Sequence, residues 1–177
     1  MILYVVRHGQ IKPNVTHIIA SCSKHDLTKE GIIQAEKARD KIKNIDYDIV
    51  FCSPLKRAVH TMEIINEKNV KCIFDDRLKE RKAGILEGKK TSCCDLDTYW
   101  NYYKNEKYEN AESIKELFDR VKEFLEFLKK NYSGKKVLLV THDGVCRTIE
   151  SLIYGIPKDG NIRAYAYKNC EIRKYEI

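Results

Sequence analysis

The stretch Ile2-Leu-Tyr-Val-Val-Arg-His8 indicates the fold class of this chain and the edge at which its function should be sought. Residues 2–6 form a short, continuous apolar run, which is typical of a strand buried on both faces of a parallel sheet. The run stops abruptly at Arg7 and His8. Two polar side chains are therefore expected just beyond the carboxyl end of the first strand.

Further along the chain, apolar runs alternate with segments of helical periodicity. Strands are predicted over residues 49–52, 71–74 and 137–140. Thr28 is predicted to cap a helix over 29–43, and Ser53-Pro54 provides an N-cap and first-turn pair for the next one. Ser113-Ile-Lys-Glu116 is a capping box followed by an apolar stripe. A last helix is expected to end near Gly155.

This alternation predicts a single α/β domain over residues 1–177, with a mostly parallel central sheet and helices on both faces. Residues 82–110 hold two glycines and a Tyr/Trp cluster, and we interpret them as a small flap over one end of the sheet. Residues 163–177 are predicted to form a terminal hairpin.

The polar residues that follow the predicted strands suggest an anion site. In parallel α/β sheets, ligands bind beyond the carboxyl ends of the strands, so Arg7-His8, Arg57 and His142 should meet at one rim. Guanidinium groups match phosphate oxygens, and a neutral imidazole among cations can attack phosphorus. Such a reaction still needs a carboxylic acid to protonate the leaving oxygen.

Several blocks, in a fixed order, carry a family resemblance. Leu3-Tyr-Val-Val-Arg7-His8-Gly9-Gln10 resembles the opening of the histidine phosphatase superfamily, the phosphoglycerate mutase-like family. The resemblance covers essentially the whole chain. Its further blocks are Leu27-Thr-Lys-Glu-Gly31 followed by Gln34-Ala35, Ser53-Pro-Leu-Lys-Arg57-Ala-Val-His-Thr61, Leu78-Lys-Glu80-Arg81 with Gly84 and Leu86-Glu87-Gly88, Glu112-Ser113, and Val140-Thr-His142-Asp-Gly144-Val.

The resemblance implies a role for each matching residue. His8 matches the nucleophile that becomes phosphorylated, and Glu80 matches the proton donor. Arg7, Arg57 and His142 match the phosphate pocket. The substrate-binding candidates beside the phosphate are Gln10, Asn14, Ser21 and Asp143. The family works without a metal ion, and no cofactor is expected.

Departures from the mutase pattern favour hydrolysis. The mutases of the family typically carry a Tyr three positions and a Lys eleven positions after the acid, where this chain has Ala83 and Thr91. Asp143 stands where many members have Gly, a change that is tolerable if the position acts through its backbone N–H. We therefore expect a metal-independent phosphatase of small phosphomonoesters. The alternatives are a phosphoglycerate mutase and a non-catalytic phosphate- or RNA-binding module.

Composition limits the partners and the compartment. Lys and Arg number 33 against 26 Asp and Glu, a net charge of +7 that favours anionic partners. We expect a small phosphorylated metabolite, and neither nucleic acid nor a membrane. Seven cysteines without a C-x-x-C pattern, and an N-terminal apolar run too short for a signal peptide, favour the cytoplasm. His17, Cys22 and His25 have metal-ligand chemistry at close spacing, but they supply only three ligands.

Overall fold

The computed structural model describes all of residues 1–177 and is built around one five-stranded sheet. Its strands are β1 (Ile2–Arg7), β2 (Ile49–Cys52), β3 (Cys72–Phe74), β4 (Lys136–Thr141) and β5 (Ile172–Glu176). They lie in the order β3-β2-β4-β1-β5. The first four strands are parallel, and β5 pairs antiparallel with β1 at one edge. The predicted mostly parallel sheet is confirmed.

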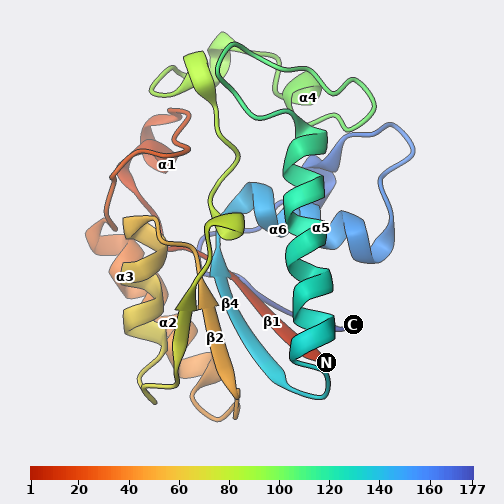
Figure 1. Cartoon of the computed structure of the whole chain (residues 1–177). Helices are drawn as coiled ribbons and strands as arrows, with labels where there is room; N and C mark the ends of the chain where they lie inside the picture. Colours follow the sequence, from red (N-terminus) through yellow and green to blue (C-terminus); the bar gives the residue numbers. More distant parts are fainter.

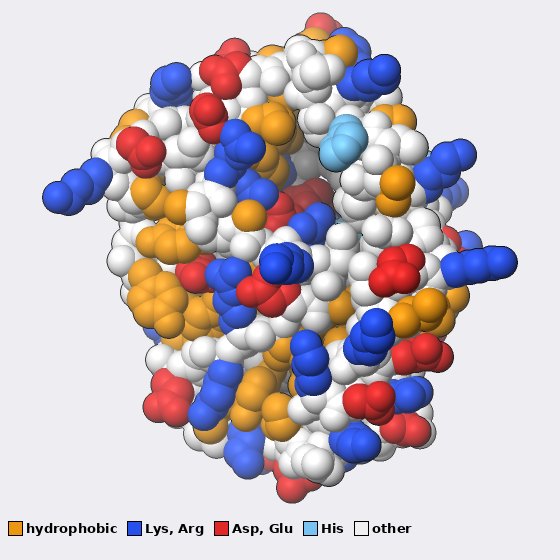
Figure 2. All heavy atoms as spheres, turned by 180° about the vertical axis from the view of Figure 1, so that it is seen from behind, with side chains coloured by type: hydrophobic (Ala, Val, Ile, Leu, Met, Phe, Trp, Pro, Cys, Tyr) orange, Lys and Arg blue, Asp and Glu red, His pale blue; other side chains and the backbone are white.

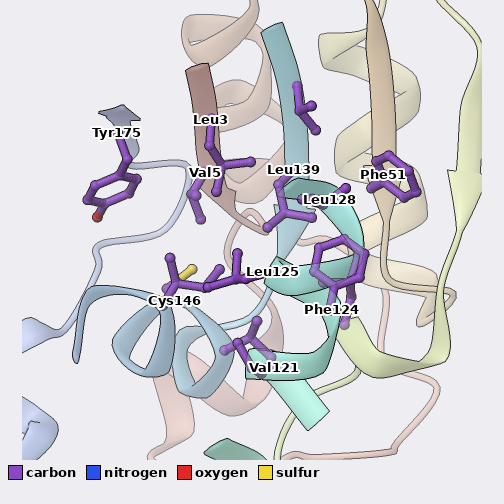
Figure 3. Packing of buried hydrophobic residues seen from close by; sticks show 14 of the residues in the cluster. Leu3, Val5, Phe51, Val121, Phe124, Leu125, Leu128, Leu139, Cys146 and Tyr175 are labelled. Carbon is purple, nitrogen blue, oxygen red and sulfur yellow. The ribbon is translucent and has the colours of Figure 1, made fainter. Parts of the chain in front are cut away.

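Helices cover both faces of this sheet, as predicted (Figure 1). They are α1 (Lys12–Thr16), α2 (Lys29–Ile42), α3 (Lys56–Ile65), α4 (Leu96–Tyr99), α5 (Ile114–Asn131) and α6 (Asp143–Tyr154). α5 and α6 pack on one face, where Phe51 of β2 meets Phe124 of α5 edge-on at 5.5 Å between ring centroids (Figure 3). α2 and α3 pack on the other face. Two apolar layers therefore hold the sheet rigidly between helices.

The predicted helix caps have mixed outcomes. Thr28 accepts the N–H of Gly31 over 3.0 Å, and the capping box of Ser113 and Glu116 is present. The Ser53-Pro54 cap is wrong. α3 begins at Lys56 with Leu55 as its N-cap, and the Ser53 hydroxyl accepts the N–H of Leu55 over 3.3 Å in the turn before the helix.

The C-terminal hairpin prediction is also wrong. Residues Ile162–Tyr165 form a short 3-10 helix, and only β5 is a strand in that region. The strand finds its partner in β1 at the other end of the chain instead of in its own neighbour. The short helix α1 was not predicted, since five residues carry too little periodicity to be recognised.

The flap lies above the carboxyl ends of the strands (Figure 1). It consists of two 3-10 helices, Gly84–Leu86 and Thr91–Cys93, followed by α4. Its own small apolar cluster contains Ala83, Leu86 and Tyr99. No helix of the chain combines the length and apolarity needed to span a bilayer.

Candidate active site

The strand order brings polar residues that are distant in sequence to one edge. β2, β4 and β1 are neighbours in the sheet, and Ser53, His142 and His8 follow directly after their last residues. The imidazole rings of His8 and His142 lie 5.1 Å apart between centroids. The rim expected from the sequence is therefore formed at the carboxyl edge of the sheet.

His8 is held in a defined tautomer. Arg57 Nε donates to His8 Nε2 over 3.2 Å, and a guanidinium has only donors, so Nε2 carries a lone pair. Nδ1 must then carry the proton, which it donates to the carbonyl oxygen of Gly9 over 2.7 Å. The ring is only 3% exposed. His8 thus presents one fixed, unprotonated nitrogen to a positively charged neighbour.

The surroundings keep both imidazoles neutral. Burial, followed by the charges of Arg57 and Arg7, holds the pKa of His8 well below its ordinary value. Burial also lowers the pKa of His142, and Arg57 and His8 act in the same direction. A neutral imidazole is a nucleophile, whereas the imidazolium is not. The His8 imidazole therefore stays neutral to a lower pH than an ordinary histidine.

Arg57 is fully buried and forms no direct ion pair, although the carboxylates of Glu80 and Glu87 act on its charge from a distance. Its Nη2 donates to the carbonyl oxygen of Ser21 over 2.7 Å, and its Nη1 donates to that of Ser23 over 3.2 Å. The residue sits in the first turn of α3, where backbone N–H groups lack intrahelical acceptors. A buried cation held by two carbonyl oxygens and a neutral imidazole is suited to attract an anion.

Two buried side-chain nitrogens near His8 have no partner in the protein, Arg7 Nε and His142 Nδ1. Arg7 Nε is a donor, and His142 Nδ1 is a donor in the tautomer in which the Ser53 hydroxyl donates to His142 Nε2 over 2.7 Å. Buried donors without acceptors are rare because they cost free energy. Both fit the oxygens of a phosphoryl group.

Glu80 is a half-buried carboxyl group at the wall of the cavity described below. Its Oε1 accepts the N–H of Arg81 over 2.8 Å, and its two oxygens lie 3.2 and 3.3 Å from the N–H of Gly144. Burial raises the pKa of Glu80 and Asp143 adds to the effect, although these N–H groups and Arg57 oppose it. The carboxyl group therefore keeps its proton to a higher pH than an ordinary Glu, as a proton donor requires.

A cavity of about 210 Å³ lies at this edge, bounded by the loop after β1, the flap and α6. Its lining includes five of the residues predicted from the sequence: Arg7, Asn14, Ser21, Glu80 and Asp143. Figure 2 shows the molecule hollowed in its upper half, with basic and acidic side chains inside the hollow. The cavity is large enough for a phosphate and a small organic group.

The side chains of Gln10 and Ser21 form hydrogen bonds with other residues of the protein near the cavity. Gln10 does not line it, and its Oε1 accepts the hydroxyl of Thr28 over 3.0 Å. The Ser21 hydroxyl donates to Glu87 and accepts the N–H of Ala83 over 3.1 Å. Direct substrate binding by these two side chains stays a prediction, and both have a structural partner already.

Asn14 and Asp143 are placed at the wall of the cavity with their acceptor oxygens engaged. Asn14 Oδ1 accepts the N–H of Ile11 over 3.0 Å. The Asp143 carboxylate is paired with Arg147 and lies 3.7 Å from Arg7 Nη1. The backbone N–H of Asp143, at the first position of α6, is the group left for an anion.

Sequence reasoning missed several residues that shape the site. Thr61 Oγ1 accepts the N–H of Gly9 over 3.0 Å and donates to the carbonyl oxygen of Arg57 over 2.7 Å, which joins the two halves of the site. Thr61 is the last residue of the Ser53–Thr61 block of the family resemblance, but the sequence alone assigned it no role. Asn169 donates to the carbonyl oxygen of His8 over 3.0 Å, and nothing in the sequence links these two positions.

Trp100 and Arg147 form another part of the cavity wall that the sequence did not reveal. The guanidinium carbon of Arg147 lies 4.8 Å from the centroid of the Trp100 ring.

The three metal-ligand candidates from the sequence do not come together. The structure gathers no group of three metal-ligating side chains, so His17, Cys22 and His25 do not form a ligand set.

Comparison with known proteins places the chain in a family. A model of the histidine phosphatase superfamily (branch 1) matches residues 3–177, and the chain belongs to this family. "Uncharacterized phosphatase PhoE" of Bacillus subtilis (strain 168) is 33% identical over 152 residues, which cover 85% of this chain and 76% of PhoE. "Probable phosphoglycerate mutase GpmB" of Escherichia coli O1:K1 / APEC is 30% identical over 181 residues, covering 98% and 84%.

Solved structures confirm the fold. YhfR of Bacillus stearothermophilus superimposes with a TM-score of 0.89 at 24% identity, covering 99% of this chain and 91% of that one. The alpha-ribazole phosphatase of Shigella flexneri gives a TM-score of 0.86 at 23% identity, with coverage of 100% and 91%. The family resemblance predicted from the sequence is confirmed, and the chain is a phosphatase- or mutase-like phosphoryl-transfer enzyme.

The buried charge of Arg57 makes a prediction about anion binding. Arg57→Ala removes a buried donor whose hydrogen bonds to a charged ligand are each worth roughly 1.5–3 kcal/mol, so the Kd of inorganic phosphate should rise about tenfold to a hundredfold. Isothermal titration calorimetry measures this. Lys56→Ala is the matched control, because Lys56 is adjacent but 62% exposed. Equal phosphate affinity in Arg57→Ala and the wild type would place the anion elsewhere.

Proposed function

We propose that the protein is a phosphatase that hydrolyses small phosphomonoesters through a phosphohistidine at His8. The observation that carries this proposal is the fixed lone pair of His8 Nε2, which lies 3.2 Å from the buried guanidinium nitrogen Nε of Arg57. Glu80, whose pKa is raised by burial, lines the same cavity as Arg7. A nucleophile, an anion pocket and an acid are therefore assembled together.

In the first step, His8 Nε2 attacks phosphorus while the bond from phosphorus to the ester oxygen breaks. Arg7, Arg57 and His142 hold the phosphoryl oxygens and stabilise the charge that develops on them. The proton of the Glu80 carboxyl group passes to the leaving oxygen, which departs as an alcohol. The Nδ1–H bond to the Gly9 carbonyl stabilises the ring as it gains positive charge.

In the second step, a water molecule attacks the phosphohistidine. Glu80, now a carboxylate, takes a proton from the water as its oxygen bonds to phosphorus. The bond from phosphorus to Nε2 breaks, and the electron pair returns to the ring. Inorganic phosphate leaves, and neutral His8 and protonated Glu80 are restored, so the cycle closes without an additional reactant.

Two positions of the flap favour transfer of the phosphoryl group to water over its transfer back to the released alcohol, which a mutase requires. Ala83 is fully buried, and Thr91 lines the cavity with a short side chain, where the mutases resembled by the sequence carry Tyr and Lys. The cavity thus lacks these two long side chains that would hold a released alcohol. Its volume of about 210 Å³ supports a small phosphorylated metabolite as the substrate.

Trapping the covalent intermediate tests this mechanism. Rapid quenching with a 32P-labelled phosphate ester should give a label on His8 that is lost in acid and stable in base. The reason is that the P–N bond of a phosphohistidine hydrolyses when its nitrogen is protonated. His8→Gln should carry none. His60→Gln is the matched control, since His60 is paired with Asp26 outside the site and should keep the label. Label on a Ser or Cys of an active preparation, or no label in a single turnover, would refute the phosphohistidine. Release of an isomeric ester in place of phosphate would favour the mutase.

The acid role of Glu80 predicts a dependence on the leaving group. Nitrophenolate leaves without a proton, whereas an alkoxide does not. Glu80→Gln should therefore lower kcat/KM for glycerol 3-phosphate by about 10²–10⁴-fold and that for p-nitrophenyl phosphate much less. Steady-state kinetics with both substrates measures the difference. Equal losses for the two substrates would contradict a general acid at this position.

A further inference from the structure

Arg81, the residue next to the proposed acid, has a side chain that the reaction above leaves unused. It is only 1% exposed and is among the largest fully buried side chains of the protein. A buried guanidinium is costly unless its donors are satisfied. The partners that satisfy these donors therefore indicate what the residue holds in place.

All of these partners are backbone carbonyl oxygens on one side of the cavity. Nε donates to Glu112 over 2.9 Å, Nη2 donates to Glu106 over 3.2 Å, and Nη1 donates to Tyr99. The guanidinium carbon also lies 4.0 Å from the centroid of the Tyr99 ring. One side chain thus joins three points of the segment 99–112, which runs from α4 through the end of the flap to the start of α5.

The same segment lies beside the acid. Trp100 follows Tyr99, and a Cβ placed on Gly144 would lie 2.9 Å from the Trp100 ring and 2.3 Å from Glu80 Oε1. The indole, the glycine and the carboxyl group therefore meet at one point. In addition, the backbone N–H of Arg81 donates to Glu80 Oε1 over 2.8 Å. Arg81 therefore contacts Glu80 through its backbone N–H, and its side chain holds the segment 99–112 that lies beside Glu80.

We propose that Arg81 is the positioning residue of the general acid, which fixes the Tyr99–Trp100 corner beside Glu80 and so shields the half-buried carboxyl group from part of the solvent and keeps it aimed at the leaving oxygen. This inference rests on the proposed function. When the corner is released, more water reaches Glu80 and part of the burial that raises its pKa is lost. The carboxyl group then ionises at lower pH and loses the proton that it must donate.

Arg81→Lys tests the proposal, because a lysine keeps the charge and the stem but loses the planar fork that reaches three carbonyls. Its loss in kcat/KM should be at least about tenfold larger for glycerol 3-phosphate than for p-nitrophenyl phosphate. The alkaline fall of kcat for glycerol 3-phosphate should also move to lower pH, since a less buried Glu80 loses its proton earlier. A merely structural residue has no reason to distinguish the two leaving groups.

A double-mutant cycle with Glu80→Gln makes the test specific. Once Glu80 cannot donate a proton, Arg81→Lys should cost less than about threefold more on glycerol 3-phosphate. Arg77→Lys is the matched control. Arg77 is a partly buried arginine four positions earlier, and it pairs with Asp75 and Glu123 away from the flap. It should lower kcat/KM for both substrates alike.

Equal losses for both substrates in Arg81→Lys, or costs that add independently of Glu80→Gln, would overturn the proposal. If Arg81→Lys does not fold, Tyr99→Leu is the second variant, because it removes the ring beneath the guanidinium. Its loss in kcat/KM should also be larger for glycerol 3-phosphate than for p-nitrophenyl phosphate. Equal losses for the two substrates in Tyr99→Leu would also overturn the proposal. A wild-type protein that hydrolyses neither ester would instead reject the proposed function, and this inference with it.

Discussion

The contact between Arg57 Nε and His8 Nε2 is the interaction on which the rest of the site depends. It decides which ring nitrogen bears the lone pair, and it directs that lone pair toward the buried guanidinium. The guanidinium that makes this contact is buried and forms no direct ion pair with a carboxylate. The Ser21 and Ser23 carbonyl oxygens accept hydrogen bonds from the Arg57 guanidinium and fix its position. Thr61 links the backbone of Gly9 to that of Arg57.

Several buried polar and charged groups at this edge lack a partner in the protein, which costs free energy that an anionic ligand would recover. Arg7 Nε and His142 Nδ1 are buried without partners, and burial lowers the pKa of both imidazoles. Burial also raises the pKa of Glu80, so it favours the neutral form of His8 and the protonated form of Glu80. The rigid sheet between two helix layers maintains positions that isolated loops would relax away from.

Much of the fold and the centre of the site were predictable from local sequence patterns. Apolar runs mark β1, β2 and β4, and the polar residues directly after them, His8 and His142, lie where parallel strands end. The pairing of β5 with β1 was not predictable, because a strand of the last residues carries no signal for a partner at the first ones. Asn169 was missed for the same reason, since its contact with the His8 carbonyl exists only after that pairing.

The flap was the least predictable part of the chain. Its turns are short 3-10 helices without a hydrophobic period, and their shape is set by contacts from outside, such as the Arg81 side chain. Sequence patterns therefore indicated that residues 82–110 cover the sheet but not that Trp100 and Arg147 would line the cavity. Ser21 shows the same limit, because its hydroxyl turned out to be engaged by Glu87 and Ala83.

The most direct measurement of the central claim is the protonation state of His8 in the free protein. 15N NMR of the histidine rings across a pH titration, with His8 assigned by comparison with His8→Gln, reports both the charge and the tautomer. The account predicts a neutral ring with its proton on Nδ1 at pH values well below the ordinary histidine pKa of about 6.5. A ring that becomes cationic at or above that ordinary value, or one that carries its proton on Nε2, would contradict it.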